Sequence, residues 1–207
     1  MPHLIYVADP MCSWCWGFAR SLEALEERAP EGVTVRLVMG GLAPDSDEPM
    51  PEATRRYIQA AWDAVEARTG ASFNRDFWTR CSPRRSTWMS CRSVIAAEQA
   101  EPGAGRRMFG AIQRAYYQQA RNPSEVDTLV EVAGEVGLDG EEHRRALASP
   151  EVEAALRRDF ELRDELGVTG YPSVALERAD GTREVIIRGY ADPDECRGME
   201  LGALFRG

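Results

Sequence analysis

The first forty residues alternate between apolar runs and an amphipathic stretch, and they predict a strand, a helix and a second strand. Residues 3–8, with the apolar run Leu4-Ile5-Tyr6-Val7, are typical of a short buried strand. Apolar residues then recur at helical spacing between residues 14 and 28, and a second strand-like run covers residues 33–39. The run ends at Gly40 and Gly41, which predict a turn. The two strands of such a unit should be parallel, with a right-handed connection.

The middle of the chain shows only helical periodicity. A stretch rich in Pro, Asp, Ser and Glu at residues 42–50 predicts a linker. After it, apolar side chains recur every three or four positions within residues 51–69, 83–100, 108–116 and 126–133. The pattern therefore predicts an all-helical block from about residue 45 to residue 150.

The last quarter of the chain returns to strands. Residues 151–166 predict a helix, which the sequence Gly167-Val168-Thr169-Gly170-Tyr171-Pro172-Ser173 interrupts. Two short apolar runs, residues 174–177 and 184–188, flank a turn-forming segment and predict a hairpin. Pro193 is placed to open a final helix that runs towards residue 205.

Cys12 and Cys15 lie where the first strand passes into the first helix. The first turn of a helix has backbone N–H groups without intrahelical partners and the positive end of the helix dipole. A thiolate placed there is stabilised, and thiol pKa values at such positions fall from about 8.5 to roughly 3.5–7.5. We therefore predict that Cys12 is an exposed nucleophile and that Cys15 is its buried partner, with exchange running through a mixed disulfide.

Zinc binding and a purely structural disulfide fit the cysteine pair less well. A zinc site needs a second pair of ligands, but the sequence has no second CxxC motif and its only histidines are His3 and His143. We expect no metal ligands in this chain. A structural disulfide between residues so close in sequence would restrain the unfolded chain little. A chance CxxC without redox chemistry stays open on the motif alone.

Composition and charge exclude several classes of partner. The 207 residues carry a net charge of −9, which disfavours a nucleic-acid surface, and every one of the 25 basic residues is arginine. No apolar run is long enough to span a bilayer, so we expect no membrane contact. We expect no secretory signal before the first strand. We therefore expect a cytoplasmic protein whose five cysteines are thiols or catalytic groups.

The ends of the chain, joined around the helical block, have the element order of the thioredoxin fold. The segments around Cys12 and around Tyr171-Pro172 resemble the DsbA family of thiol-disulfide oxidoreductases, specifically the FrnE-like branch of predicted protein-disulfide isomerases. The resemblance covers essentially the whole chain and implies a thioredoxin-like α/β fold with a large all-helical insertion domain. It implies two parts of the thioredoxin-like domain at residues 1–44 and 151–207, with the insertion at residues 45–150.

The resemblance also assigns roles to residues. Cys12 becomes the nucleophile, Cys15 the resolving cysteine, and Pro172 a cis-proline that faces them. The backbone of Tyr171 would then pair with an extended substrate. We expect Ser13, Trp14 and Tyr171 to contact the substrate, with Trp14 facing solvent and Trp16 packing under the helical domain. Substrates would be protein or small-molecule thiols and disulfides.

Several assignments stay open at this point. Asp9 and Glu23 are candidates for a buried acid that assists deprotonation of Cys15. Cys81, Cys91 and Cys196 are interpreted as packing residues, with a second redox pair of Cys81 and Cys91 as the alternative. The pair of catalytic cysteines needs no bound cofactor, although glutathione would be a suitable reductant.

Two further functions are compatible with the architecture. Kappa-class glutathione transferases and 2-hydroxychromene-2-carboxylate isomerases resemble this chain in the helical insertion, but they typically have serine at the position of Cys12 and lack the pair. Cys12 and Cys15 therefore disfavour them. A non-catalytic, chaperone-like binder would use Trp14, Tyr171 and the helical cleft, and its function would survive replacement of Cys12 by serine.

Overall fold

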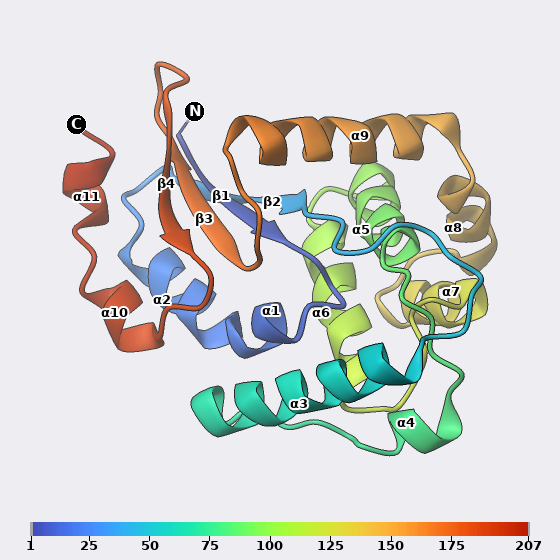
Figure 1. Ribbon diagram of the computed structural model, residues 1–207. Helices are drawn as coiled ribbons and strands as arrows, with labels where there is room; N and C mark the ends of the chain where they lie inside the picture. Colours follow the sequence, from blue (N-terminus) through green and yellow to red (C-terminus); the bar gives the residue numbers. More distant parts are fainter. Residues whose placement is uncertain (1, 207) are drawn as a thin grey trace.

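A mixed four-stranded sheet forms the centre of the computed structural model, which describes residues 2–206. The strand order is β2-β1-β3-β4; β1 pairs with β2 in parallel, whereas β1 with β3 and β3 with β4 are antiparallel. Figure 1 shows this sheet with helices packed on both faces. The predicted parallel pair and hairpin are confirmed. The strands are β1 (His3–Ala8), β2 (Thr34–Met39), β3 (Ser173–Glu177) and β4 (Arg183–Arg188).

The central strand β1 is apolar from Leu4 to Ala8 because both of its faces are covered. Side chains of a strand alternate between the two faces of the sheet. Leu4 and Tyr6 belong to the core shared with α2 (Ala19–Arg28) and α10 (Pro193–Arg197), whereas Ile5 and Val7 pack with residues of α9 (Pro150–Glu165). A continuous apolar run therefore reflects burial on both sides.

Every regular element between β2 and α9, a segment that the structure describes in full, is a helix, apart from one isolated bridge between Pro49 and Arg84. The fold is thus thioredoxin-like with a large helical insertion, as predicted. The helices not yet named are α1 (Ser13–Gly17), α3 (Glu52–Thr69), α4 (Phe77–Arg80), α5 (Trp88–Ala100), α6 (Ala104–Tyr117), α7 (Val126–Glu135), α8 (Gly140–Leu147) and α11 (Leu201–Leu204). None of the helices within residues 2–206 combines the length and apolar character needed to cross a membrane.

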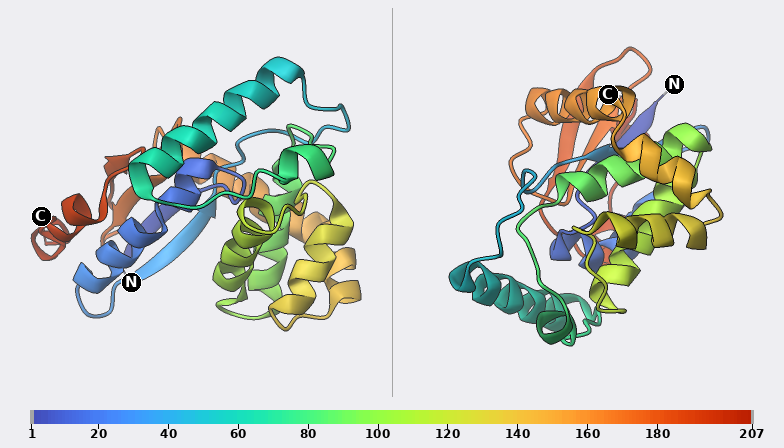
Figure 2. Two further views of the ribbon diagram at one scale, coloured as in Figure 1. Left: turned by 90° about the horizontal axis from the view of Figure 1, so that it is seen from below. Right: turned by 90° about the vertical axis from the view of Figure 1, so that its right-hand side faces the viewer.

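The insertion contains its own aromatic cluster but also shares a core with the sheet. Figures 1 and 2 show α3 and α4 along one side of the molecule and the bundle of α5 to α8 beside the sheet. Trp62 of α3 is fully buried, and the rings of five neighbouring residues pack around it. Apolar residues of α5 and α6 join the same core as β1, so the bundle and the sheet pack together. The exact domain boundaries at residues 44/45 and 150/151 stay a prediction.

Three predicted helices differ from the observed ones. The helix expected over residues 14–28 is two helices, α1 and α2, which meet at Phe18. The break lies beside α3, where a Cβ atom at Gly17 would come within 2.9 Å of Val65 and Thr69. The helix expected over residues 83–100 begins only at Trp88, and the final one divides into α10 and α11 at Gly198. Helical spacing alone does not detect such interruptions, because they depend on contacts with other elements.

Asp159 of α9 connects that helix to the end of β2. One carboxylate oxygen accepts a hydrogen bond from the Met39 backbone N–H at 2.8 Å. Burial raises the pKa of the Asp159 carboxyl from 3.8 to about 6, although the bond from Met39 opposes this effect. A carboxyl whose pKa is higher in the folded chain than in the unfolded chain stabilises the fold at low pH. That contribution is lost as the pH rises from about 4 to about 6.

Asp159→Asn is therefore expected to stabilise the protein by about 2 kcal/mol near neutral pH, because it keeps the acceptor and removes the charge. Below about pH 4 the two proteins should be equally stable. Urea unfolding over this pH range measures the difference. A difference that does not depend on pH would contradict this role of the Asp159 charge.

Candidate redox site

The two cysteines of the motif begin helix α1. β1 ends at Ala8, and the Cys12 N–H then donates a hydrogen bond to the Asp9 carbonyl at 3.0 Å, which closes a tight turn. Cys12 is the N-cap residue of α1, and its carbonyl accepts a bond from the Trp16 N–H at 3.1 Å. Both Cys12 and Cys15 are free thiols. The strand-to-helix position expected from the sequence is confirmed.

The segment that contains Pro172 packs against the sulfur of Cys12. The Cys12 thiol donates to the Tyr171 carbonyl, with a sulfur–oxygen distance of 3.6 Å, across 159 positions of sequence. The peptide bond between Tyr171 and Pro172 is cis. The Cys12 residue is only 6% exposed, so the prediction of an exposed nucleophile is wrong for the residue as a whole. The sequence could not show this, because the segment that contacts the sulfur comes from the far end of the chain.

Two glycines lie close to aromatic rings near the site, and one of them contacts Tyr171. The Tyr171 hydroxyl donates to the Gly40 carbonyl at 2.6 Å, and a Cβ atom at Gly40 would overlap its ring. Gly41 has a positive φ of 67° and lies against the ring of Phe160. The turn predicted at this pair is thus also a place where aromatic rings approach the backbone closely.

Cys15 is more deeply buried than Cys12, with 1% of its surface exposed. Burial raises the pKa of the Cys15 thiol well above its usual value, and the neighbouring Cys12 sulfur acts in the same direction through a hydrogen bond and its charge. A thiol held in its protonated form can donate a hydrogen bond to the neighbouring sulfur. The predicted burial of Cys15 is thus confirmed, whereas its role as the resolving cysteine stays a prediction.

Asp9 joins the cysteine loop to the helical insertion. Its buried carboxylate accepts bonds from the Met11 N–H at 2.8 Å, the Leu42 N–H at 2.7 Å, the Thr87 hydroxyl at 2.6 Å and the Cys91 thiol at 3.5 Å. Burial raises the pKa of this carboxyl, and these donors partly offset the effect. Hydrogen bonds from three separate segments of the chain thus meet at the Asp9 carboxylate, close to Cys12.

The tryptophans that flank the motif differ in their packing. Trp16 lies under the insertion as expected: its ring stacks on Tyr117, with centroids 5.7 Å apart, and its indole N–H donates to the Ser72 carbonyl. Trp14 does not simply face solvent, because it is half-buried against the ring of Tyr190. Ser13, expected to contact substrate, is 9% exposed.

The remaining cysteines lie in separate places. Cys91 is fully buried in α5 beside Asp9, and Cys196 is fully buried in α10. The Cys81 thiol donates to the Ala120 carbonyl at 3.1 Å, so Cys81 and Cys91 bond to different groups. The structure brings Cys91, rather than Cys81, to the edge of the candidate site. The sequence offered no signal for the contact between Cys91 and Asp9.

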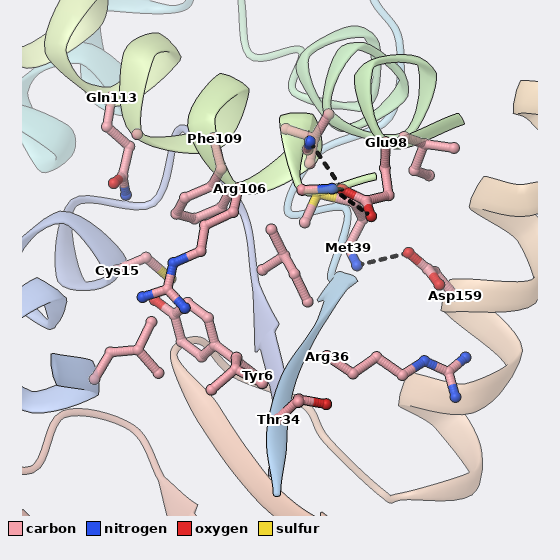
Figure 3. A pocket seen from close by; sticks show the side chains of 18 of the residues that line it. Tyr6, Cys15, Thr34, Arg36, Met39, Glu98, Arg106, Phe109, Gln113 and Asp159 are labelled. Atoms are coloured by element: carbon pink, nitrogen blue, oxygen red, sulfur yellow. Dashed lines mark hydrogen bonds between the residues drawn. The ribbon is translucent and has the colours of Figure 1, made fainter. Parts of the chain in front are cut away.

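A cavity of about 750 Å³ lies behind the cysteine pair, between the sheet and the helices α5 and α6. Figure 3 shows Tyr6 and Cys15 on one wall, with Arg106, Phe109 and Gln113 of α6 opposite. Glu23, one of the two acids proposed from the sequence to assist Cys15, also lines this cavity. Within residues 2–206, no three His, Cys, Asp or Glu side chains gather as a metal site.

Comparisons with known proteins agree with this geometry. The family model of the DSBA-like thioredoxin domain matches residues 3–197. Among solved structures, the chain resembles a candidate protein disulfide isomerase from Nitrosomonas europaea, with 28% identity, a TM-score of 0.86 and coverage of 99% of this chain and 97% of that one. It also resembles the cytosolic disulfide reductase DsbM from Pseudomonas aeruginosa, with 31% identity, a TM-score of 0.78 and coverage of 99% and 98%. DsbM has also been determined with GSH.

A curated relative has a different name. The ClpXP adapter protein SpxH of Bacillus subtilis is 26% identical over 178 residues, which are 84% of this chain and 58% of that protein. This chain therefore spans less than two thirds of the length of that relative.

Proposed function

Because the chain belongs to the family of DSBA-like thioredoxin domains, we propose that it is a thiol-disulfide oxidoreductase whose reacting groups are Cys12 and Cys15. The single observation that carries this proposal is the free dithiol that begins α1, with the Cys12 sulfur against the Tyr171 carbonyl. Both thiols lie in one site, and burial keeps Cys15 protonated by raising its pKa. Such a pair supplies a nucleophile and a protonated resolving group.

The exchange would proceed in two steps. The Cys12 thiolate attacks one sulfur of a substrate disulfide, forms a mixed disulfide and releases the first substrate thiolate. Cys15 then loses its proton and attacks the Cys12 sulfur, which forms the Cys12–Cys15 disulfide and releases the second thiolate. The substrate is reduced by two electrons and the dithiol is oxidised by two. The reverse sequence would transfer a disulfide to a dithiol.

The substrate would bind as an extended segment along the backbone before Pro172. In the reduced protein the Tyr171 carbonyl accepts a hydrogen bond from the Cys12 thiol, so this carbonyl lies next to the reacting sulfur. Packing against Gly40 fixes the position of Tyr171. Trp14 and Ser13 begin the same helix as Cys12 and would complete the contact with substrate. Pro172 would contribute by holding this segment beside the pair.

The direction of exchange that we propose is reduction in the cytoplasm, with glutathione as a suitable source of electrons and no bound cofactor. The similarity to a protein named as a cytosolic disulfide reductase, and determined with GSH, supports this choice. Isomerisation of protein disulfides is a second use of the same dithiol, in keeping with the name of the Nitrosomonas relative. The substrates would be protein or small-molecule disulfides.

A binding role without disulfide exchange is the second candidate. The adapter name of the Bacillus relative favours it, since an adapter acts by holding other proteins. This role does not require a redox-active dithiol. The two candidates therefore differ in whether Cys12 is needed.

A redox titration tests the proposed function. Trp14 and Trp16 flank the pair, so the intrinsic fluorescence should follow its oxidation state. In buffers of reduced and oxidised glutathione, the protein is expected to show one reversible two-electron transition. A midpoint near about −270 mV would fit a reductant, and one near about −120 mV would fit an oxidant. Absence of any transition would contradict the exchange function and favour the binding role.

A further inference from the structure

Tyr6 is the polar neighbour of the resolving cysteine. It belongs to the buried strand β1 and is 3% exposed, and it lines the same cavity as Cys15. Figure 3 shows the ring of Tyr6 reaching across the cavity wall towards Cys15. The carboxylate of Asp9 is instead saturated by donors from the loops and from α5. The group placed to exchange a proton with Cys15 is therefore a phenol.

Tyr6 and Cys15 both line the cavity between the sheet and α6. On the opposite wall, the Gln113 residue is 4% exposed and its side-chain Nε2 has no hydrogen-bond partner in the protein. Figure 3 shows the Gln113 amide directed into the cavity. Buried polar groups without protein partners are normally satisfied by water. The cavity thus has the size and polarity to hold water next to Tyr6.

From this arrangement, and resting on the proposed function, we propose that Tyr6 relays the proton of Cys15 to water in the cavity during the second step of exchange. As the Cys15 S–H bond breaks, the Tyr6 oxygen accepts that proton and the Tyr6 O–H proton passes to water. The Cys15 sulfur then forms its bond with the Cys12 sulfur, and the substrate thiolate leaves with the electron pair. In the reverse direction the same relay returns a proton to Cys15.

A relay suits this site better than a separate base. Burial, together with the neighbouring Cys15 and Cys12, raises the pKa of Tyr6 well above its usual value, so the phenol stays neutral. A neutral hydroxyl can accept and donate a proton at once, whereas a buried carboxylate would add a negative charge beside a forming thiolate. Such repulsion is expensive in an apolar interior.

The guanidinium group that reaches over Tyr6 is already paired with a carboxylate. Arg106 of α6 reaches over Tyr6 and forms an ion pair with Glu26 of α2 through both terminal guanidinium nitrogens. The titratable groups that face Cys15 are Cys12, Asp9, Tyr6 and, from α6, Tyr117. Glu23 lines the same cavity and could receive the proton from water.

Tyr6→Phe is the direct test, with Tyr116→Phe as a matched control. Tyr116 is a buried tyrosine of the aromatic cluster, packed on Trp62 and Phe77. The reduced protein is mixed rapidly with a chromophoric aryl disulfide, which releases one coloured thiolate at each step. In Tyr6→Phe we expect an unchanged first phase and a second phase slowed by roughly tenfold to a hundredfold, as for loss of one acid–base group. The loss should shrink as the pH rises, because hydroxide can then remove the proton directly.

A measurement on the unaltered protein makes the test independent of whether Tyr6→Phe folds. In D2O the second phase of the wild-type protein should slow more than the first, because only the second moves a proton through the relay. Equal isotope effects on the two phases, or a second phase unchanged in folded Tyr6→Phe, would overturn the role of Tyr6 while leaving the oxidoreductase intact. Absence of both phases in the wild-type protein would instead overturn the proposed function, and the relay with it.

Discussion

Cys12→Ser is expected to abolish disulfide exchange. A serine hydroxyl neither ionises near neutral pH nor forms a disulfide, so the first step cannot begin. The rate of disulfide reduction should fall by at least roughly 10³-fold, in the range seen when an enzyme loses its nucleophile. Release of the coloured thiolate from an aryl disulfide measures this rate. Cys81→Ser is the matched control, because Cys81 bonds to Ala120 away from the pair and serine keeps the donor.

The partner variant Cys15→Ser should separate the two steps. It keeps the Cys12 nucleophile, so it should release one thiolate per protein and then stop as a mixed disulfide. Mass spectrometry would detect the added substrate half on Cys12. If Cys12→Ser retained the wild-type rate, the dithiol mechanism would be wrong. If Cys12→Ser also retained a binding partner that the wild-type protein holds, the adapter-like role would be favoured.

Asp9→Ala is expected to have the largest effect on stability. The substitution leaves the Met11 and Leu42 N–H groups and the Thr87 hydroxyl without their acceptor in a buried site. Buried donors without partners cost about 1–3 kcal/mol each, and partial relaxation should limit the total to about 3–5 kcal/mol. Exchange should also slow, because the loop that positions Cys12 loses its anchor. Urea unfolding and the aryl disulfide assay measure the two effects.

Asp9→Asn provides the graded comparison. An asparagine can present its carbonyl oxygen to the Leu42 N–H, the Thr87 hydroxyl and the Cys91 thiol, but its amide then faces the Met11 N–H. We expect a loss of stability smaller than that of the alanine variant. If both variants were as stable as the wild-type protein, Asp9 would not anchor the cysteine loop.

The fold could be predicted because its signals are local. Residues 3–8 are apolar at nearly every position, and this run is β1, buried on both faces. The helical spacing after residue 50 is the insertion, and the turn between the last two apolar runs is the hairpin of β3 and β4. Each of these patterns depends on residues that are only a few positions apart in the chain, so it can be recognised in the sequence directly. The interruptions at Phe18 and Gly198 were missed because the spacing of apolar residues does not report packing partners.

The candidate site could be predicted only in part. The positions of Cys12 and Cys15 follow from the motif and the strand before it, and the sequence also drew attention to Pro172. It offered no sign that Thr87 would reach Asp9 across 78 positions, or that Tyr6 would lie beside Cys15 on one cavity wall. The apolar pattern of β1 concealed Tyr6, since a tyrosine in a buried strand is ordinarily interpreted as a packing residue. Its place shortly before Cys12, on the same face of the strand as Leu4, was the available signal.

The amino-acid sequence by itself determined the order of strands and helices, the inserted helical block and the dithiol at the start of α1. Propensity, hydrophobic period and motif spacing act over a few residues, so they can be recognised without knowing the fold. Only the tertiary structure decided what surrounds the two sulfurs: Tyr171 beside Cys12, Tyr6 beside Cys15, and Asp9 bound to α5. Burial and hydrogen bonding set the properties of a thiol, and both depend on contacts between segments that are distant in the chain.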